Sequence, residues 1–300
     1  MIFDVLSDEI RRKRNPTCVG LDTSLKCLPQ GFKLRFDTDT LEGAAEAILA
    51  YNKELIDALE YIVPAVKVQA AYYEMYGVPG MRAFQSTLRY AKRAGFVVIA
   101  DAKRNDIAST AEAYAKAYLG ETELMNSRTP VFDADILTVN PYLGSDGIAP
   151  FVNENPKKGI FALVKTSNPS SADLQDMILA DGRAVYEAVG DLVVKWGQGT
   201  AAFDGFPRVG AVVGATYPQQ GIELRTRMPS TFFLLPGYGT QGAKGKDIAG
   251  MFDRQGSGAI VNNSRSILMA WEKENTDFKS AACAAAIRMR EDINAALRQG

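Results

Sequence analysis

The feature that most constrains the fold is a regular alternation of short apolar runs with amphipathic segments of helical period. Apolar runs of this length, rich in aliphatic residues, are typical of buried strands in a parallel sheet. We expect eight such strands, at residues 17–21, 65–69, 96–100, 136–140, 160–164, 209–213, 231–235 and 259–261. The periodic segments predict helices at residues 41–61, 81–94, 108–119, around 171–196, 219–227, 247–252 and 279–298.

Strands that alternate with helices indicate a parallel sheet whose crossover connections are helical. Eight such strands predict a closed (β/α)8 TIM barrel, and an open doubly wound sheet is the main competitor. The chain has 300 residues, which one barrel can accommodate, and no linker rich in Pro, Gly or Ser divides it. We therefore expect residues 1–300 to form a single barrel domain, with loop elaborations at 121–133 and 168–207.

The charge balance limits the classes of partner. The chain has 34 Lys and Arg against 35 Asp and Glu, so nucleic acid, which selects a basic excess, is not an expected partner. No apolar run approaches the ~20 residues of a membrane span, and the acidic start of the chain does not resemble a signal peptide. Three scattered cysteines are too few for a disulfide framework. These features predict a cytoplasmic protein without a membrane partner.

The chain contains no histidine. That absence excludes Ser-His-Asp and Cys-His catalysis, and it also excludes zinc sites built on histidine. Proton transfer would have to use Lys, Asp, Glu, Tyr or Cys. The residues show no pattern for thiamine, pyridoxal or a metal ion, so we expect no cofactor and no metal.

Charged residues gather at the predicted strand ends. The third run ends in Asp101 and Lys103, and their spacing places both side chains on one face of a strand. Asp22 follows the first strand, Lys67 lies within the second, and Asp106 follows the third. Each residue alone has a structural explanation, such as a helix cap for Asp106. Catalytic residues of barrels lie at strand carboxyl ends, however, so the charges together indicate a catalytic cluster.

A glycine-rich segment follows the seventh predicted strand. Residues 237–242 read Gly-Tyr-Gly-Thr-Gln-Gly, which matches the G-x-G-x-x-G dinucleotide fingerprint. That fingerprint belongs to a first βα turn, whereas this match comes late in the chain. Barrels often bind phosphate with the loops after strands seven and eight, and Arg265 follows the eighth strand. We therefore expect these two loops to hold a phosphate group.

Residues 101–107, Asp-Ala-Lys-Arg-Asn-Asp-Ile, resemble the D-x-K-x-x-D-I signature of orotidine 5′-phosphate decarboxylases. The similarity extends from residues 20–22 to Arg265, and the form Asp-Ala-Lys-Arg is similar to the longer bacterial-type branch of the family. Related metal-dependent sugar-phosphate decarboxylases and synthases share D-x-K-x-x-D. Lys67, residues 236–242 and Ser264-Arg265-Ser266 make the resemblance more specific.

The resemblance implies an enzyme that decarboxylates orotidine 5′-monophosphate to uridine 5′-monophosphate, the last step of de novo pyrimidine nucleotide synthesis. No cofactor would be needed. Lys103 would stabilise and then protonate a carbanion at C6, in a charged network with Lys67, Asp101 and Asp106. The flanking carboxylates would keep Lys103 protonated.

The resemblance also implies a homodimer with shared sites. Asp106, Ile107 and Thr110 would reach into the active site of a second subunit. On the substrate itself, Asp22 and Lys67 would bind the ribose hydroxyls.

The pyrimidine and phosphate contacts follow from the same resemblance. Ser167 would bind the pyrimidine, with the neighbouring Thr166 as the alternative hydroxyl. The remaining substrate-binding residues would be Pro236, Gln241, Ser264 and Arg265, with Gln241 and Arg265 on the 5′-phosphate. Ser264 stands where many relatives have glycine.

Three other functions stay open on the residues alone. A metal-dependent sugar-phosphate decarboxylase or synthase of the same superfamily would need a divalent ion. A Schiff-base aldolase would use Lys67 or Lys103, although adjacent carboxylates raise the pKa of a lysine and so oppose that role. A catalytically silent barrel would bind a nucleotide without releasing CO2.

Overall fold

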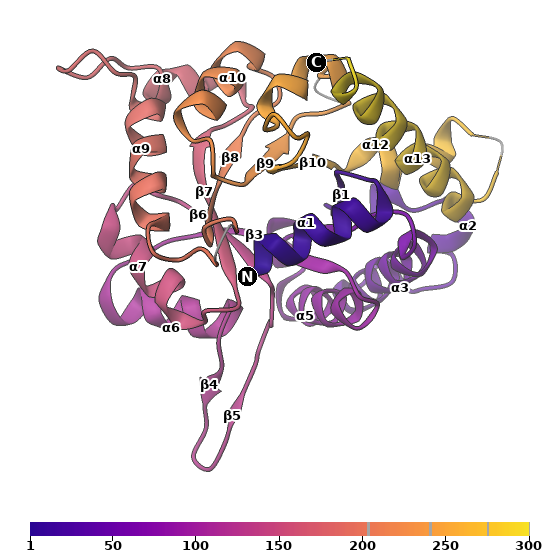
Figure 1. The fold of residues 1–300 in the computed structure, drawn as a ribbon. Helices are drawn as coiled ribbons and strands as arrows, with labels where there is room; N and C mark the ends of the chain where they lie inside the picture. Colours follow the sequence, from indigo (N-terminus) through magenta and orange to yellow (C-terminus); the bar gives the residue numbers. More distant parts are fainter. Residues whose placement is uncertain (203–204, 240–241, 275, 300) are drawn as a thin grey trace.

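The structure is a computed structural model that describes residues 1–202, 205–239, 242–274 and 276–299. In these residues, eight parallel strands form a closed barrel in the spatial order β1-β2-β3-β6-β7-β8-β9-β10, with helices around it (Figure 1). The strands are β1 (Thr17–Leu21), β2 (Ala65–Gln69), β3 (Val97–Arg104), β6 (Ile136–Val139), β7 (Gly159–Lys165), β8 (Val209–Val213), β9 (Phe233–Pro236) and β10 (Ala259–Asn263). The barrel closes where β1 pairs with β10, so the (β/α)8 prediction is confirmed and the open sheet is excluded.

The helices differ more from the prediction than the strands do. The longer helices are α1 (Ile2–Lys13), α3 (Leu41–Leu59), α5 (Gly77–Arg93), α6 (Ala108–Tyr118), α7 (Ser145–Glu154), α9 (Val185–Gly197), α10 (Pro218–Arg227) and α13 (Phe278–Leu297). The shorter ones are α2 (Gln30–Lys33), α4 (Ala71–Glu74), α8 (Ala172–Gln175), α11 (Gly245–Ile248) and α12 (Arg265–Leu268). The helical stretch predicted around 171–196 is wrong as one helix, because the chain turns at Gly182 (φ 88°) between α8 and α9.

Sequence reasoning missed α7 entirely. Gly147 and Pro150 lie inside this helix and lower its intrinsic helix propensity. Ile148, Phe151 and Val152 nevertheless share one face at helical spacing, and all three are buried. Tertiary packing of that face therefore outweighs the weak local preference.

Side chains of the strands alternate between two layers. Val66 and Val98 belong to the large cluster that also contains buried residues of the surrounding helices. Ala65 and Val97 point the opposite way and belong to a smaller cluster inside the barrel. This period of two carries over to the polar residues at the strand ends, because every second residue faces the barrel axis.

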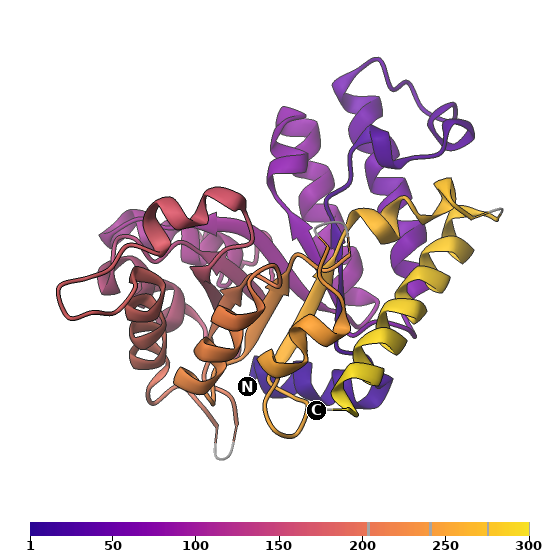
Figure 2. The same cartoon turned by 90° about the horizontal axis from the view of Figure 1, so that it is seen from above.

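Helix α1 closes the amino-terminal end of the barrel. Ile2, Phe3 and Leu6 pack in the interior cluster, and the ring of Phe3 stacks on Phe232 with centroids 5.1 Å apart. Figure 2 shows α1 (indigo) on one side of the barrel, while the segments after β1 (purple) and β7 (pink) rise on the opposite side. The polar strand ends therefore open toward the side that α1 does not cover.

The loop elaboration predicted at residues 121–133 is present. The stretch 121–133 contains a hairpin of β4 (Thr122–Glu123) and β5 (Arg128–Thr129), which projects away from the barrel (Figure 1). The stretch 168–207 is only partly an elaboration, because it includes α9, the helix that connects β7 to β8 and packs against both strands. The addition to the barrel is the part that contains α8. Within the described ranges, no helix has the length and apolar character needed to cross a membrane.

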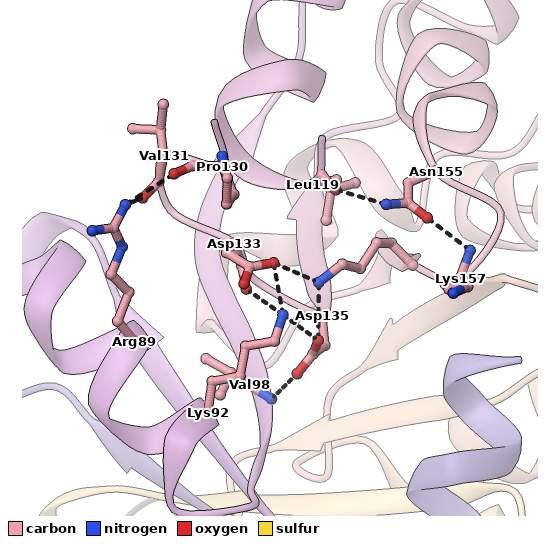
Figure 3. Close-up of polar contacts among 11 residues, drawn as sticks. Arg89, Lys92, Val98, Leu119, Pro130, Val131, Asp133, Asp135, Asn155 and Lys157 are labelled. Carbon is pink, nitrogen blue, oxygen red and sulfur yellow. Dashed lines mark hydrogen bonds and ion pairs between the residues drawn. The ribbon is translucent and has the colours of Figure 1, made fainter. Parts of the chain in front are cut away.

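A group of four charges lies where the chain enters β6 and β7, and we call it the amino-end ion cluster. It consists of Lys92, Asp133, Asp135 and Lys158, of which the first three are labelled in Figure 3. The Nζ atom of Lys92 is 2.7 Å from Asp133 Oδ1 and 3.1 Å from Asp135 Oδ1, and Lys158 Nζ is 3.0 Å from each of these two atoms. Asp135 also accepts a hydrogen bond from the backbone N–H of Val98 at 3.0 Å. Each ammonium thus has two carboxylate partners.

Candidate active site

A cavity of about 470 Å³ lies at the carboxyl-terminal end of the barrel and takes residues from the ends of all eight barrel strands or the loops after them. Nine of the predicted site residues line it: Asp22, Lys67, Asp101, Lys103, Thr166, Ser167, Pro236, Ser264 and Arg265. Gln241, the other predicted phosphate contact, lies outside the described residues. The cavity therefore gathers residues that are far apart in the sequence, because parallel strands bring their carboxyl ends to one face.

Four of these residues form a chain of alternating charge, which we call the carboxyl-end ion cluster. Lys67 Nζ lies 3.1 Å from Asp22 Oδ1 and 2.8 Å from Asp101 Oδ2. Lys103 Nζ lies 2.7 Å from the other oxygen of Asp101. The Lys67 side chain is 5% exposed, whereas the Lys103 side chain is 45% exposed. Lys103 is therefore the ammonium that a substrate can reach.

The electrostatics keep the buried members of this cluster ionised. Burial alone would raise the pKa of Asp101, but the charges of Lys67 and Lys103 outweigh it and hold that pKa well below its usual range. Burial alone would lower the pKa of Lys67, but Asp101 and Asp22 outweigh it and raise that pKa above its usual range. Asp101 is thus a carboxylate and Lys67 an ammonium at neutral pH.

Two neutral residues complete the surroundings of Asp101, and sequence reasoning did not assign them a role. Gln69 donates from Nε2 to Asp101 Oδ2 at 3.0 Å. Thr138 donates from Oγ1 to Asp101 Oδ1 at 2.8 Å and accepts from the backbone N–H of Lys103 at 3.0 Å. Lys103 has a φ of 49°, in the left-handed region that is unfavourable for its side chain. Thr138 therefore stabilises both the carboxylate and the strained backbone that presents the ammonium.

Ser264 and Arg265, which follow β10, also line the cavity. A side chain at Gly20 would place its Cβ 2.0 Å from Ser264 Oγ, so Gly20 in β1 leaves room for this hydroxyl in its present position. The neighbouring Arg265 is exposed and lines the cavity. Within the described part of the chain, Arg265 has no ion pair, so its guanidinium is available to an anion.

The two candidate pyrimidine contacts differ in their hydrogen bonds. The Thr166 hydroxyl donates to Asn168 Oδ1 at 2.6 Å and accepts from Gln175 Nε2 at 2.8 Å. Ser167 is held through its backbone carbonyl, which accepts from Thr216 Oγ1 at 3.1 Å. The Thr166 hydroxyl is therefore already engaged in both directions.

Asp106, Ile107 and Thr110 do not join the cavity of their own chain. Asp106 Oδ1 accepts from the backbone N–H of Ile107 at 2.8 Å, and Ile107, not Asp106, is the residue that precedes the first turn of α6. Ile107 is 53% exposed and Thr110 is also exposed. The three residues thus form part of the outer surface at the start of α6.

A sequence model of the orotidine 5′-phosphate decarboxylase / HUMPS family matches residues 16–276, which include the whole barrel and its cavity. The chain belongs to this family. The family's members include orotidine 5′-phosphate decarboxylases with similarity over nearly the full length of this chain.

Three relatives illustrate the extent of that similarity. The orotidine 5′-phosphate decarboxylase of Rhodopirellula baltica is 42% identical over 297 residues, which are 96% of this chain and 97% of the relative. That of Caldicellulosiruptor bescii is 41% identical over 300 residues, 98% of each chain. The solved structure of Leishmania donovani OMP decarboxylase superposes with a TM-score of 0.77 at 32% identity and covers 99% of both chains. These relatives do not favour the metal-dependent alternative.

In residues 1–202, 205–239, 242–274 and 276–299, no group of three or more His, Cys, Asp or Glu side chains is placed to hold a metal ion. Asp22 and Asp101, the two carboxylates in the cavity, are instead both paired with Lys67.

Proposed function

We propose that this member of the orotidine 5′-phosphate decarboxylase family decarboxylates orotidine 5′-monophosphate to uridine 5′-monophosphate, and that residues 1–300 act as one barrel domain. The observation that carries the proposal is the position of Lys103. Its ammonium is reachable from the cavity and is held 2.7 Å from a carboxylate that is itself buried and ionised. Such a group can stabilise negative charge and then deliver a proton.

The proposed reaction needs only the substrate, Lys103 and water. The bond between C6 and the carboxylate carbon breaks, CO2 leaves, and the electron pair stays on C6. The ammonium of Lys103 stabilises that pair and transfers one proton to C6, which gives the product and a neutral amine. The amine regains a proton from water. Asp101, which keeps its negative charge throughout, positions the ammonium before the reaction.

Lys67 is not proposed as a Schiff-base lysine. Such a lysine needs a lowered pKa, whereas the carboxylates around Lys67 raise its pKa. Lys67 is therefore proposed as a binding group that contacts ribose together with Asp22. Lys103 is proposed as the proton donor.

The remaining contacts are proposed by their place around the cavity. Ser167, whose neighbour Thr166 is already engaged, would bind the pyrimidine. Arg265 would bind the 5′-phosphate with Gln241, alongside Pro236 and Ser264. Because the phosphate is remote from C6, its binding energy would serve to orient the reacting carbon.

The test is a decarboxylation assay with metal-free protein. We expect protein treated with EDTA to remove the absorbance of orotidine 5′-monophosphate and to release CO2 and uridine 5′-monophosphate in equal amounts. Turnover that appears only after a divalent ion is added would instead support the metal-dependent enzyme. Nucleotide binding without CO2 release would support the silent barrel.

We further propose a homodimer in which Asp106, Ile107 and Thr110 complete the partner's site. The exposure of Ile107 and Thr110 at the start of α6 supports this arrangement. Lys103→Ala and Asp106→Ala are each expected to be inactive alone. Mixing them should then restore up to about a quarter of wild-type activity, because half of the exchanged dimers carry one intact site. No recovery after confirmed subunit exchange would contradict the shared site.

A further inference from the structure

Lys165, the last residue of β7, does not point where the strand period predicts. The pairing of β7 with β8 shifts register between Leu163 and Lys165, and such a bulge redirects the side chains that follow it. Leu163 lines the cavity. Lys165 instead lies over the rings of Tyr217 and Tyr186, 4.6 Å and 5.6 Å from their centroids, with its side chain 0% exposed.

The buried ammonium of Lys165 is paired with a residue of the 168–207 elaboration. Its Nζ atom lies 2.6 Å from Oδ1 of Asp176, which directly follows α8. Asp176 Oδ1 also accepts from Gln220 Nε2 of α10 at 3.2 Å. A buried ammonium without its carboxylate would be strongly destabilising, so this pair determines where α8 ends against the barrel.

The residue before Asp176 connects this pair to the cavity. Gln175 accepts from the backbone N–H of Thr166 through Oε1 at 2.9 Å and donates to the Thr166 hydroxyl through Nε2 at 2.8 Å. One amide group therefore fixes both the backbone and the side chain of a residue that lines the cavity.

Residues 166–168 are also held by the loop after β8. Thr216 donates to the carbonyl of Ser167, and the Tyr217 hydroxyl donates to the carbonyl of Asn168, each at 3.1 Å. Tyr217 is the same residue whose ring lies over Lys165. The segment is thus clamped between α8 and the loop after β8, with Lys165 contacting both.

We propose that Lys165 and Asp176 are positioning residues that hold Gln175 against Thr166 and so set the shape of the cavity wall at residues 166–168, which recognises the base of a pyrimidine nucleotide. This inference rests on the proposed function, because it assumes that a nucleotide occupies the cavity. It assigns a purpose to the elaboration after β7: α8 supports the base-binding wall without contacting the substrate.

The test compares two ligands that share ribose and phosphate but differ in the base. Uridine 5′-monophosphate and ribose 5-phosphate are titrated calorimetrically against wild type, Asp176→Asn and Gln175→Ala, with the exposed neighbour Asp173→Asn as the matched control. We expect both variants to bind uridine 5′-monophosphate about tenfold or more weakly, as loss of a well-placed hydrogen bond implies, and to bind ribose 5-phosphate within about twofold of wild type. The Asp173→Asn control should bind both ligands as wild type does.

Gln175→Ala keeps the buried ion pair intact, so it tests the contact of Gln175 with Thr166 even if Asp176→Asn does not fold. Equal weakening of both ligands, or unchanged uridine 5′-monophosphate binding in Gln175→Ala or in folded Asp176→Asn, would overturn the positioning role. Decarboxylation by wild type is measured separately. Its absence would count against the proposed function, while the comparison of the two ligands would still decide the positioning role.

Discussion

The barrel carries two clusters of two lysines and two aspartates, one near each end, and their geometry differs in one decisive respect. In the amino-end ion cluster, Lys92 and Lys158 each contact both Asp133 and Asp135. In the carboxyl-end ion cluster, Lys67 contacts both Asp22 and Asp101, but Lys103 contacts only Asp101. In the first cluster, each ammonium contacts both carboxylates. In the second, the ammonium of Lys103 contacts one carboxylate and is partly exposed to a cavity.

The setting of each cluster explains the difference. The amino-end ion cluster lies beside residues 130–131, whose carbonyls also accept hydrogen bonds from Arg89 (Figure 3). Its charges hold the root of the β4–β5 hairpin against the barrel. The carboxyl-end ion cluster lines a cavity of about 470 Å³ that also contains Arg265 and Ser167. The carboxyl-end ion cluster is therefore the one placed to act on a ligand, because Lys103 has a single carboxylate partner and faces a space that a ligand can enter.

The largest expected effect is at Lys103. Lys103→Ala removes both the stabilising charge and the proton donor, so kcat for decarboxylation should fall by roughly 10⁴-fold or more. The variant should still fold and bind uridine 5′-monophosphate, because Lys67, Gln69 and Thr138 continue to contact Asp101. The assay is loss of substrate absorbance, with circular dichroism as the folding control. Turnover near the wild-type rate would contradict the proposed role.

Arg265→Ala should have the next largest effect on activity. Losing a charged contact to the phosphate should lower kcat/KM by about 2–5 kcal/mol in free-energy terms. Ribose 5-phosphate should also bind more weakly to this variant, because the lost contact does not involve the base. A small change in kcat/KM would show that another group binds the phosphate.

Lys158→Met should show that the two clusters have different roles, one in stability and one in activity. Asp133 and Asp135 then each lose one of their two lysine partners, so the free energy of unfolding should fall by about 1–3 kcal/mol. The value of kcat/KM should stay within about twofold of wild type, because the cluster does not touch the cavity. Lys157→Met, at the exposed neighbouring position, is the matched control for denaturant unfolding. A large loss of activity in folded Lys158→Met would mean that the two ends are coupled.

The smallest effect is expected in the pH dependence of stability. Burial would raise the pKa of Asp133, but the hydrogen bonds and charges of Lys92 and Lys158 lower it overall. Since the folded pKa lies below the unfolded value of about 3.9, this stabilisation is present at higher pH and is lost as pH falls through the folded pKa. The free energy of unfolding should therefore fall below about pH 4, less steeply in Asp133→Asn than in wild type. Identical slopes in the two proteins would contradict the assignment.

The strands and the charged residues could be predicted because each leaves a periodic signal in the sequence. Asp101 and Lys103 share one strand face, and strand direction alone brings Lys67 and Asp22 beside them. Gln69 could have been found by the same rule, since it lies two residues after Lys67. Thr138 could not, because a single hydroxyl at a strand end has no distinguishing pattern.

Other features depend on tertiary structure that no local pattern encodes. The direction of Lys165 follows from a register shift between β7 and β8, and α7 forms although Gly147 and Pro150 weaken it. No sequence pattern predicts the amino-end ion cluster either, because Lys92 lies on a helix some 40 residues away in sequence from the aspartates that it contacts.

The central claim is that Lys103 exchanges a proton with C6 of the nucleotide, and hydrogen exchange tests it most directly. In D2O, the reverse of the protonation step would remove the C6 hydrogen of uridine 5′-monophosphate, and the return step would replace it with deuterium. Proton NMR should show loss of the H6 signal with wild type and no loss above the background rate with Lys103→Ala. Equal exchange in the two proteins, at saturating nucleotide, would contradict the assignment of Lys103 as the proton donor.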